Sequence, residues 1–449
     1  MSVVRLSEID NNLLRIEAEY FQKKYINMES IVNSYNTLSC YTSKIDCGPF
    51  GSNLLDTKYE STGILVVRPF NLKNYTIEKE NLVYISKETV IQNKLKIYNK
   101  GTLLFSRVGD IKVGISNQNN ITISPNVIAV KLKNADFAKY LAVFFHTKYG
   151  FLQIERNLKV SAQPTISTEI ISKLKVLYNI DTIQKVAKIF DKALELIDVS
   201  QQKYSEAENL LLETLQLKDF HIANEPVNIK SIKESFLKTG RLDAEFYQHK
   251  YEAIEQKIKM YQEGFARLCD VCIIKDESFI PEENTVYSYI ELSDIGTSGE
   301  VTGCTLDQGK NLPSRAKRKV NKNDVIISSI EGSLSSCAII SKCYHNALCS
   351  TGFYVLASKT INAETLLVLF KSELMQQILK RNCSGTILTA INKEEFLNLP
   401  IPVIAKEYQT KIAEYIQKAQ ALREEAKSLL ENAKLQVEKE ISANSSILP

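Results

Sequence analysis

Residues 183–217 read IQKVAKIFDKALELIDVSQQKYSEAENLLLETLQL, and the rest of this 449-residue chain is arranged around them. Apolar or small residues recur in this stretch at alternating steps of four and three positions. That spacing is a heptad seam, and it predicts one uninterrupted amphipathic helix, roughly 52 Å long at about 1.5 Å per residue. Asp181 and Gln184 have the spacing of a capping box at its start. The seam consists of Val186, Phe190, Ala193, Ile197, Ser200, Tyr204, Ala207 and Leu211.

A second stretch, residues 408–441, repeats the pattern and supplies a partner for the first. Pro400 and Pro402 stand just before it, where they end a strand without disturbing the helix. Because a helix of this length cannot bury its own apolar stripe, the two stretches predict an antiparallel intramolecular pair. The alternative is two separate helices that pack on unrelated cores. The second seam consists of Ile412, Tyr415, Ala419, Leu422, Ala426, Leu429, Ala433, Val437 and Ile441.

The composition indicates an ordinary soluble globular protein of several domains, since 44% of the residues are hydrophobic and 24% are charged. No run of roughly 18 apolar residues occurs, and the start MSVVRLSEID has the features of neither a signal peptide nor a transit peptide. Nine scattered cysteines favour reduced thiols, and hence a cytoplasmic protein, over a disulfide framework. The formal net charge of +4 permits nucleic-acid binding without demanding it.

The chain contains an internal repeat of about 225 residues. RIEAEYFQKKY at residues 15–25 returns as RLDAEFYQHKY at residues 241–251, and further matched segments follow in the same order. Each half therefore reads helix, several strands with turns, one or two short helices such as residues 135–151 or 363–381, and a long helix. Residues 217–231 form the best linker between the halves. The other matched pairs are residues 65–73 with 288–296, 101–110 with 323–332, and 165–176 with 390–401.

No catalytic signature is present in the sequence, which has no P-loop, no glycine-rich dinucleotide fingerprint, no His-Glu-x-x-His and no Asn/Asp-Pro-Pro-aromatic tetrapeptide. The four histidines lie far apart and have no metal-ligand spacing. Cys269 and Cys272 form one C-x-x-C without a second pair, which favours two buried thiols on a strand over a zinc site. The sequence therefore predicts a protein with no catalytic residues and no metal.

Three loops of the first half carry residues suited to DNA contact. The turn GPFGSNL, residues 48–54, could bring backbone N–H groups close to a phosphate, and an ordinary tight turn is the alternative. Arg107 and Lys112 stand at the end of a strand and on the next turn, either as guanine or phosphate contacts or as solvated charges. The run RNLKVSAQPTIS, residues 156–167, has two basic residues followed by Gln163, a side chain suited to adenine.

The second half carries basic residues in equivalent or nearby loops. RAKRKVNK, residues 315–322, concentrates five basic residues and is typical of polyanion contact, with a solvated loop as the alternative. KRNCSGTILT, residues 380–389, stands where residues 156–165 stand in the first half. The recurrence of basic, hydroxyl and amide residues at matched loops favours a shared binding role.

The sequence resembles the specificity (S) subunits of Type I restriction–modification systems over essentially its whole length. The resemblance is carried by GPFGSNL, VVRPFNL, LLFSRVGDIKVG and SAQPTIS, by the paired R-[IL]-[ED]-A-E segments and by the two heptad helices. It implies an α+β fold in which two target-recognition domains of mixed α/β type are separated and linked by two long antiparallel coiled-coil helices, as a pseudo-twofold internal repeat. The implied domains are residues 1–178 and 225–402 for target recognition, residues 179–224 for the first spacer helix and linker, and residues 403–449 for the second spacer helix.

Membership of that family implies a DNA-recognition subunit with no catalysis of its own. Each target-recognition domain would read one half of a bipartite, asymmetric DNA site. The helices would act as a spacer and would dock two methyltransferase (M) subunits, with restriction (R) subunits joining through the complex. S-adenosylmethionine, ATP and Mg would bind to those partner subunits. The expected DNA contacts are Ser52, Asn53, Arg68, Arg107, Lys112, Arg156, Lys159, Gln163, Arg315, Lys317, Arg318, Lys380, Arg381 and Thr386. The expected partner contacts are Tyr204, Leu211, Tyr415, Leu422 and Leu429.

The second half departs from the first, since it has no GPFGS turn and has Ser329 in the place of Arg107. The two half-sites are therefore expected to differ. Two other classes of protein remain open. One is a coiled-coil scaffold without a nucleic-acid role, which the basic run at residues 315–319 counts against. The other is the recognition subunit of a Type IIB-like or phage-defence methyltransferase, which differs only in its partners.

Overall fold

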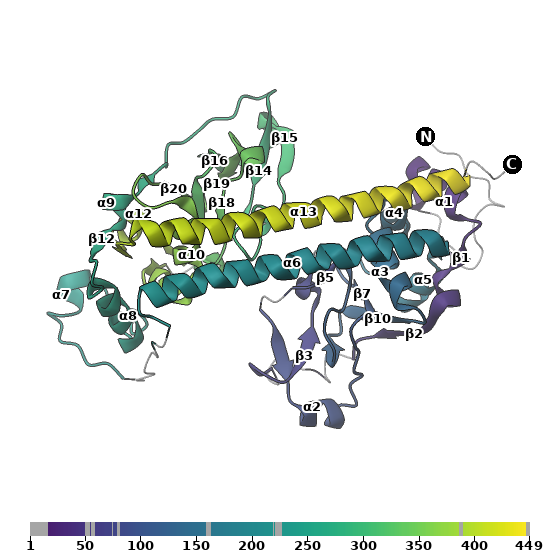
Figure 1. The fold of residues 1–449 in the computed structure, drawn as a ribbon, viewed down its shortest axis with the longest axis horizontal. Coiled ribbons are helices and arrows are strands. Elements are labelled where there is room, and N and C mark those ends of the chain that lie inside the picture. The colour runs from purple at the N-terminus through teal and green to yellow at the C-terminus, as the bar shows by residue number, and fades with distance from the viewer. Residues whose placement is uncertain are drawn as a thin grey trace. The chain divides into compact units, whose positions relative to one another are not determined.

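The computed structural model of the chain divides into two compact units. Unit 1 comprises Met1–Leu196 and Glu424–Pro449, and unit 2 comprises Ile197–Arg423. Each unit contains an α+β domain and part of both long helices (Figure 1), so the predicted fold class is confirmed. The structure describes residues 17–49, 54, 59–73, 75–78, 81–158, 163–218, 220, 227–385 and 389–445.

Both predicted long helices are present, α6 at Ile180–Thr214 and α13 at Lys406–Ser445. The capping box predicted at Asp181 is wrong, because Asn179 caps α6 instead. The side-chain oxygen of Asn179 accepts the backbone N–H groups of Asp181 and Thr182 at 3.1 and 3.2 Å. Neither of these helices, nor any other helix in the described part of the chain, has the length and apolarity of a membrane span.

In unit 2 the helices pack antiparallel along the predicted seam. Ser200 Oγ on α6 donates a hydrogen bond to the carbonyl of Ala419 on α13 at 2.8 Å. Three residues further along α6, the Lys203 ammonium lies 5.5 Å from the centroid of the Tyr415 ring. Rising residue numbers on α6 thus meet falling numbers on α13, which confirms the antiparallel pair. The buried seam residues of unit 2 are Ser200, Tyr204, Ala207, Leu211, Ile412, Ile416 and Ala419.

Unit 1 contains the first part of α6 and the last part of α13, and their seam residues are buried as well. Four predicted seam positions of the chain are only partly buried, namely Ile197, Tyr415, Leu422 and Leu429. Their neighbours Leu196 and Leu430 are buried instead, as expected when 3.6 residues per turn drift against a heptad repeat. The buried seam residues of unit 1 are Val186, Phe190, Ala193, Ala426, Ala433, Val437 and Ile441.

The domain of unit 1 is built on a six-stranded sheet in the order β2-β10-β7-β8-β5-β4. β10 (Val127–Leu132) runs antiparallel to β2 and β7, and its first four residues are all buried, as in a strand covered on both faces. A three-stranded sheet in the order β6-β3-β9 shares its apolar core with the larger sheet. The other strands are β1 Asn36–Thr37, β2 Thr42–Cys47, β3 Ile64–Val67, β4 Leu72–Lys73, β5 Thr76–Ile77, β6 Val83–Ile85, β7 Leu103–Ser106, β8 Val113–Ile115, β9 Ile121–Ile123 and β11 Lys175–Val176.

The domain of unit 2 has two four-stranded sheets, in the orders β13-β20-β17-β18 and β15-β14-β19-β16. β14 and β19 run parallel, and every other pairing in these two sheets is antiparallel. The strands are β12 Phe265–Arg267, β13 Ile273–Ile274, β14 Val286–Ile290, β15 Thr305–Gln308, β16 Ala316–Lys319, β17 Val325–Ser328, β18 Cys337–Ile339, β19 Leu348–Ser350, β20 Phe353–Ala357, β21 Cys383–Ser384, β22 Ala390–Ile391 and β23 Pro400–Pro402.

Short helices occur at matched places in the two domains, as the repeat predicts. The predicted helical regions 135–151 and 363–381 are each a pair of helices, α3 with α4 and α10 with α11. The helices of unit 1 are α1 Lys23–Val32, α2 Lys87–Gln92, α3 Ala135–Phe144, α4 Lys148–Arg156 and α5 Thr168–Lys173. Those of unit 2 are α7 Phe236–Thr239, α8 His249–Lys259, α9 Leu268–Val271, α10 Ala363–Lys371, α11 Glu373–Arg381 and α12 Lys393–Leu397.

Arg156, the last residue of α4, anchors the start of the domain in unit 1. Its Nε donates to the Tyr20 carbonyl at 3.1 Å, and its Nη1 lies 2.8 Å from Glu29 Oε2. The guanidinium also lies over the Tyr20 ring, 4.1 Å from the centroid. Only 6% of the Arg156 side chain is exposed. The contact predicted between Arg156 and DNA is therefore replaced by a packing role inside the protein.

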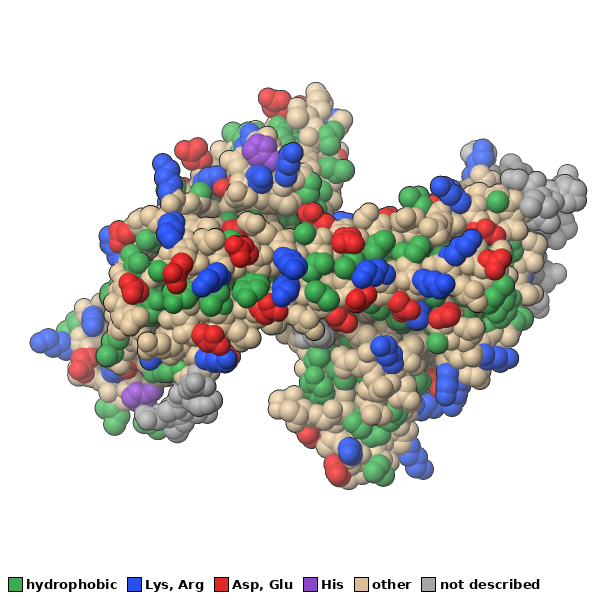
Figure 2. Space-filling view, in the orientation of Figure 1, with side chains coloured by type: hydrophobic (Ala, Val, Ile, Leu, Met, Phe, Trp, Pro, Cys, Tyr) green, Lys and Arg blue, Asp and Glu red, His purple; other side chains and the backbone are tan. Residues whose placement is uncertain are grey.

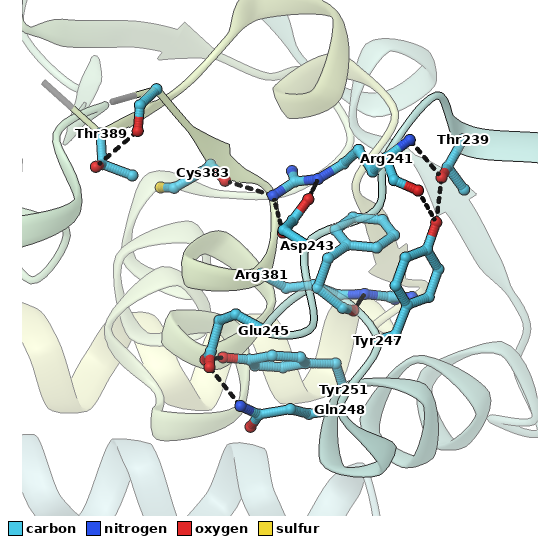
Figure 3. Close-up of polar contacts among 12 residues, drawn as sticks. Thr239, Arg241, Asp243, Glu245, Tyr247, Gln248, Tyr251, Arg381, Cys383 and Thr389 are labelled. Atoms are coloured by element: carbon cyan, nitrogen blue, oxygen red, sulfur yellow. Dashed lines mark hydrogen bonds and ion pairs between the residues drawn. The ribbon is translucent and has the colours of Figure 1, made fainter. Parts of the chain in front are cut away.

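Arg381, the last residue of α11 and labelled in Figure 3, makes the same three contacts in unit 2. Its Nε donates to the Phe246 carbonyl at 3.1 Å, its Nη1 pairs with Glu255, and its guanidinium lies 4.6 Å from the Phe246 ring centroid. The side chain is 12% exposed, so Arg381 is also corrected from a DNA contact to a packing residue. Matched anchors in both units confirm the internal repeat.

Candidate nucleic-acid interface

In unit 1 several strand ends meet at one edge of the domain. Arg68 follows β3 and Arg107 follows β7. The backbone N–H of Ser124, just after β9, donates to the Val67 carbonyl at 2.9 Å, and that of Arg107 donates to the Asn126 carbonyl at 2.8 Å. We define edge 1 as Arg68, Arg107, Ser124 and Asn126. Two of the arginines predicted from separate loops thus belong to one surface.

The turn and the polar loop predicted from the sequence also reach edge 1. Gly48 donates its backbone N–H to the Val127 carbonyl at 3.0 Å. A Cβ on Gly48 would lie 1.9 Å from the Ser124 carbonyl oxygen, so only glycine fits there. Gly109 donates to the Pro164 carbonyl at 2.9 Å, which brings in the loop that carries exposed Gln163. The predicted contacts at 52, 53 and 159 lie outside the described residues.

The cationic side chains of edge 1 differ in freedom. Arg107 is exposed, and its Nη1 lies 3.6 Å from Cys47 Sγ. Arg68 is partly buried, and its Nη2 donates to the Asn81 carbonyl. Lys112 is partly buried on the next turn, where its backbone N–H donates to Ser106 Oγ at 2.7 Å. Arg107 is therefore the cation of this surface best placed for a ligand.

Unit 2 has the same edge with other side chains. Ser329, after β17, donates its backbone N–H to the Gly352 carbonyl at 2.9 Å, as Arg107 does to Asn126 in unit 1. Parallel pairing of β14 with β19 brings Glu291 beside Ser350. The Thr351 N–H donates to the Arg315 carbonyl at 2.9 Å, which adds the start of β16. We define edge 2 as Glu291, Arg315, Ser329 and Ser350.

Three residues of edge 2, Glu291, Arg315 and Ser350, line an open cavity of about 220 Å³. Arg315 Nη2 lies 3.4 Å from Glu291 Oε1, and the two side chains are 60% and 35% exposed. Tyr289 and, less strongly, Glu291 raise the pKa of Arg315, which stays cationic. The mixed charge distinguishes edge 2 from the arginines of edge 1. The cavity is lined by Glu291, Leu292, Ser293, Arg315 and Ser350.

The remaining basic residues predicted in unit 2 lie apart from one another. Lys317 is exposed on β16, and Lys380 is exposed near the end of α11. Arg318 is partly buried, with Nε and Nη1 lacking a hydrogen-bond partner among the described residues. The predicted contact at 386 lies outside the described residues. Of this group, only Arg315 belongs to edge 2.

The residues just before 386–388 are held in place by residues 241–251, the segment that repeats residues 15–25 (Figure 3). Arg241 pairs with Asp243 at 2.6 Å and donates to the Cys383 carbonyl at 3.0 Å. On the far side, Glu331 donates its backbone N–H to the Thr389 carbonyl at 3.0 Å. The residues on both sides of 386–388 are therefore hydrogen-bonded to the rest of the domain. One of their partners, Glu331, is close in sequence to Ser329 of edge 2.

The partner contacts predicted on the helices require correction. Tyr204 and Leu211 are buried in the core of unit 2 and are unavailable to another protein. Tyr415, Leu422 and Leu429 are partly buried. The outer faces carry charges of both signs, interspersed along the helices in Figure 2. Such a surface is typical of solvent or protein contact rather than polyanion binding.

The two thiols of the cysteine pair differ in burial. Cys269 is exposed on α9, whereas Cys272 is buried just after it. The interpretation as two buried thiols on a strand is therefore wrong for Cys269. Burial raises the pKa of Cys272 to about 11, which keeps it a thiol. Across the described ranges, no three His, Cys, Asp or Glu residues are grouped to hold a metal ion.

Sequence reasoning missed Glu291, Ser350 and Ser124 as members of these edges. The repeat offered a signal, because the match of residues 65–73 with 288–296 places Glu291 opposite Arg68. Each unit therefore presents one of these edges on an equivalent backbone arrangement. Residues 264–432 match the family model described as the Type I restriction modification DNA specificity domain. Over these residues the resemblance predicted from the sequence is confirmed.

Solved structures give further likenesses. The S subunit of the Type I restriction–modification system from M. genitalium has 12% identity and a TM-score of 0.40, covering 91% of this chain and 96% of that one. The HsdS subunit from Thermoanaerobacter tengcongensis has 12% identity and a TM-score of 0.27, covering 90% and 95%. The type IIG restriction endonuclease BpuSI has 10% identity and a TM-score of 0.30, covering 40% and 29%. A search of curated proteins gives no match.

Proposed function

We propose that this chain is the DNA sequence-specificity subunit of a Type I restriction–modification complex. In this role edge 1 reads one half of a bipartite, asymmetric DNA site and edge 2 reads the other half. Methylation and cleavage belong to partner subunits.

The observation that carries the proposal is a matched backbone with unmatched side chains. Ile166 donates its N–H to the Arg107 carbonyl at 3.0 Å, and Ile391 donates to the Ser329 carbonyl at 2.9 Å. The exposed residues on these frames nevertheless differ. Two domains that read different base sequences need this combination. The shared backbone positions the reading side chains, and the side chains that contact the bases determine the sequence.

The family match supports the proposal for unit 2. All of edge 2 lies within the matched residues 264–432. The domain described by that family name is a DNA specificity domain, and Arg315 supplies the cation at the cavity. For unit 1 the proposal is supported by the anchor Arg156, which matches Arg381, and by the backbone hydrogen bonds at edge 1, which match those at edge 2.

The partners follow from the same proposal. Two methyltransferase subunits dock on the charged outer faces of the helices, and restriction subunits join through that complex. S-adenosylmethionine, ATP and Mg bind to those subunits. All nine cysteines are free thiols, which supports a cytoplasmic protein. The isolated chain is expected to transfer no methyl group from S-adenosylmethionine, and transfer by the partner-free protein would refute this assignment.

The test is methylome sequencing of the host with and without this chain. We expect one bipartite adenine-methylation motif to disappear when the chain is deleted and to return when it is restored. An unchanged methylome contradicts the proposal and favours the coiled-coil scaffold. If the motif disappears, a pull-down identifies the system. Restriction subunits support Type I, and their absence supports the Type IIB-like or phage-defence alternative.

A further inference from the structure

We infer that Glu291 and Arg315 together read one G·C base pair in the major groove of the half-site bound by unit 2. The inference rests on the proposed function and adds the identity of one base pair to it.

The fold brings these two side chains together from segments far apart in the sequence. Glu291 follows β14, and Arg315 precedes β16, on either side of the end of β19. Ser350 at that end is only 4% exposed, and its Oγ accepts the Gly352 N–H at 3.2 Å. Ser350 thus forms the fixed floor of the cavity, whereas the two charged residues stand on its rim.

The chemistry of the rim selects the ligand. In the major groove a G·C pair presents the N7 and O6 acceptors of guanine beside the N4 amino donor of cytosine. Arg315 can donate to both guanine acceptors, and the Glu291 carboxylate can accept from cytosine N4. A phosphate presents acceptors only, and its negative charge is repelled by Glu291. A donor and an acceptor side by side therefore fit a G·C edge better than the DNA backbone.

The contact between the two side chains prepares them for this role. One Arg315 nitrogen lies 3.4 Å from Glu291 Oε1, which engages a single corner of the guanidinium fork. An arginine held by a neighbour loses less side-chain entropy when it forms a bidentate contact. Glu291 therefore orients Arg315 and also offers the acceptor.

The equivalent position of unit 1 sharpens the assignment. Arg68 stands there in place of Glu291, so edge 1 has no carboxylate at the position where edge 2 has one. The G·C preference is accordingly assigned to the half-site of unit 2 alone.

The experiment selects bound sites from a random duplex library with the full-length chain. Wild-type chain should select a bipartite site with one fixed G·C pair in the half-site of unit 2. Arg315→Ala and Glu291→Ala, which remove the donor and the acceptor, should each relax that position by roughly five- to 150-fold, the usual range for a specific base contact, and leave all other positions as selected. Lys319→Ala is the matched control. It removes an exposed cation of β16 that lies over Phe279, and it should keep the G·C preference.

A chemical probe tests the contact directly. Replacing the selected guanine by 7-deazaguanine removes N7, and this should weaken binding of the wild-type chain but not of Arg315→Ala. Both variants should unfold at the wild-type temperature, because both side chains lie on the surface. A bipartite wild-type site that survives unchanged in both variants overturns the inference and leaves the proposed function standing. A wild-type chain that selects no sequence overturns the proposed function itself.

Discussion

Unit 1 and unit 2 share a set of hydrogen bonds and differ in the side chains that those bonds present. Arg107 and Ser329 have the same donor and acceptor partners through the backbone, yet one side chain is a cation and the other is a hydroxyl. The hydroxyl is satisfied within the protein, since Ser329 Oγ donates to the Gly352 carbonyl at 3.0 Å. The backbone hydrogen bonds at these positions therefore do not depend on which side chain is present.

The anchors of the two units show the opposite behaviour. Arg156 and Arg381 keep the same chemistry because their contacts are internal and are needed by both domains. Identity between the units therefore marks structural positions, and difference marks positions free to change specificity. This distinction gives four tests, which we describe in order of decreasing expected effect.

Arg156→Ala and Arg381→Ala should each destabilise their own unit by about 2–3 kcal/mol, because each removes charge-assisted hydrogen bonds and a cation–π contact. Hydrogen exchange measured separately over the two units should show the loss in the mutated unit. Lys24→Ala is the control, since its ion pair with Glu155 is exposed and should contribute less than about 1 kcal/mol. Equal losses of stability for Lys24→Ala and Arg156→Ala would contradict the role of Arg156 as a structural anchor.

Gly48→Ala should destabilise unit 1 by roughly 1–3 kcal/mol, because the new Cβ meets the Ser124 carbonyl and forces the backbone at edge 1 to shift. The temperature of thermal unfolding and the affinity for DNA should both fall. Gly332→Ala in unit 2 is the matched control, since a Cβ there meets nothing within 4 Å. A tolerated Gly48→Ala would show that the approach to Ser124 is not needed.

Arg107→Ala should weaken DNA binding by about 1 kcal/mol and leave stability within about 0.5 kcal/mol, since the side chain is exposed. If Arg107 contacts a phosphate, the log–log salt dependence should flatten by about 0.9. Ser329→Ala should change neither quantity by a comparable amount. Fluorescence anisotropy over a salt series measures both variants. An unchanged affinity for Arg107→Ala would remove that side chain from the DNA surface.

The helices and the repeat could be predicted because both are encoded locally. A heptad stripe needs only spacing along the chain, and most of the predicted seam is buried as expected. The exact cap could not be predicted, because Asn179 competes with Asp181 for the same N–H groups and only geometry decides between them.

The binding surface could be predicted only in part. Arg107 and Gln163 were found because they stand in polar loops, and the structure brings both loops to edge 1. Arg156 stands in a run of similar composition, and only its burial separates it from a DNA contact. Glu291 joins Arg315 through the parallel pairing of β14 with β19, a contact that no local pattern encodes.

The fourth test, with the smallest expected effect, concerns His146 of unit 1, whose place in the repeat is taken by Lys371 in unit 2. His146 Nε2 lies 2.9 Å from the Val113 carbonyl in unit 1, whereas Lys371 Nζ donates to the Ser335 carbonyl at 2.9 Å in unit 2. Burial lowers the pKa of His146 from its usual 6.5, and the nearby Lys434 lowers it further. Val113 and Glu431 act in the opposite direction.

The lowered pKa of His146 makes unit 1 sensitive to acid. Above about pH 6.5 the histidine is neutral in both folded and unfolded chains, and its contribution to stability is complete. Below that pH the unfolded chain binds a proton that the folded chain resists, so the stability of unit 1 falls as the pH drops toward the folded pKa. His146→Gln, whose amide can still donate to Val113, should therefore flatten the response of unit 1 between pH 7.5 and 5.5 and leave unit 2 unchanged. Hydrogen exchange of the two units at both pH values measures this, and identical slopes for wild-type and variant chains would show that His146 is not the group responsible.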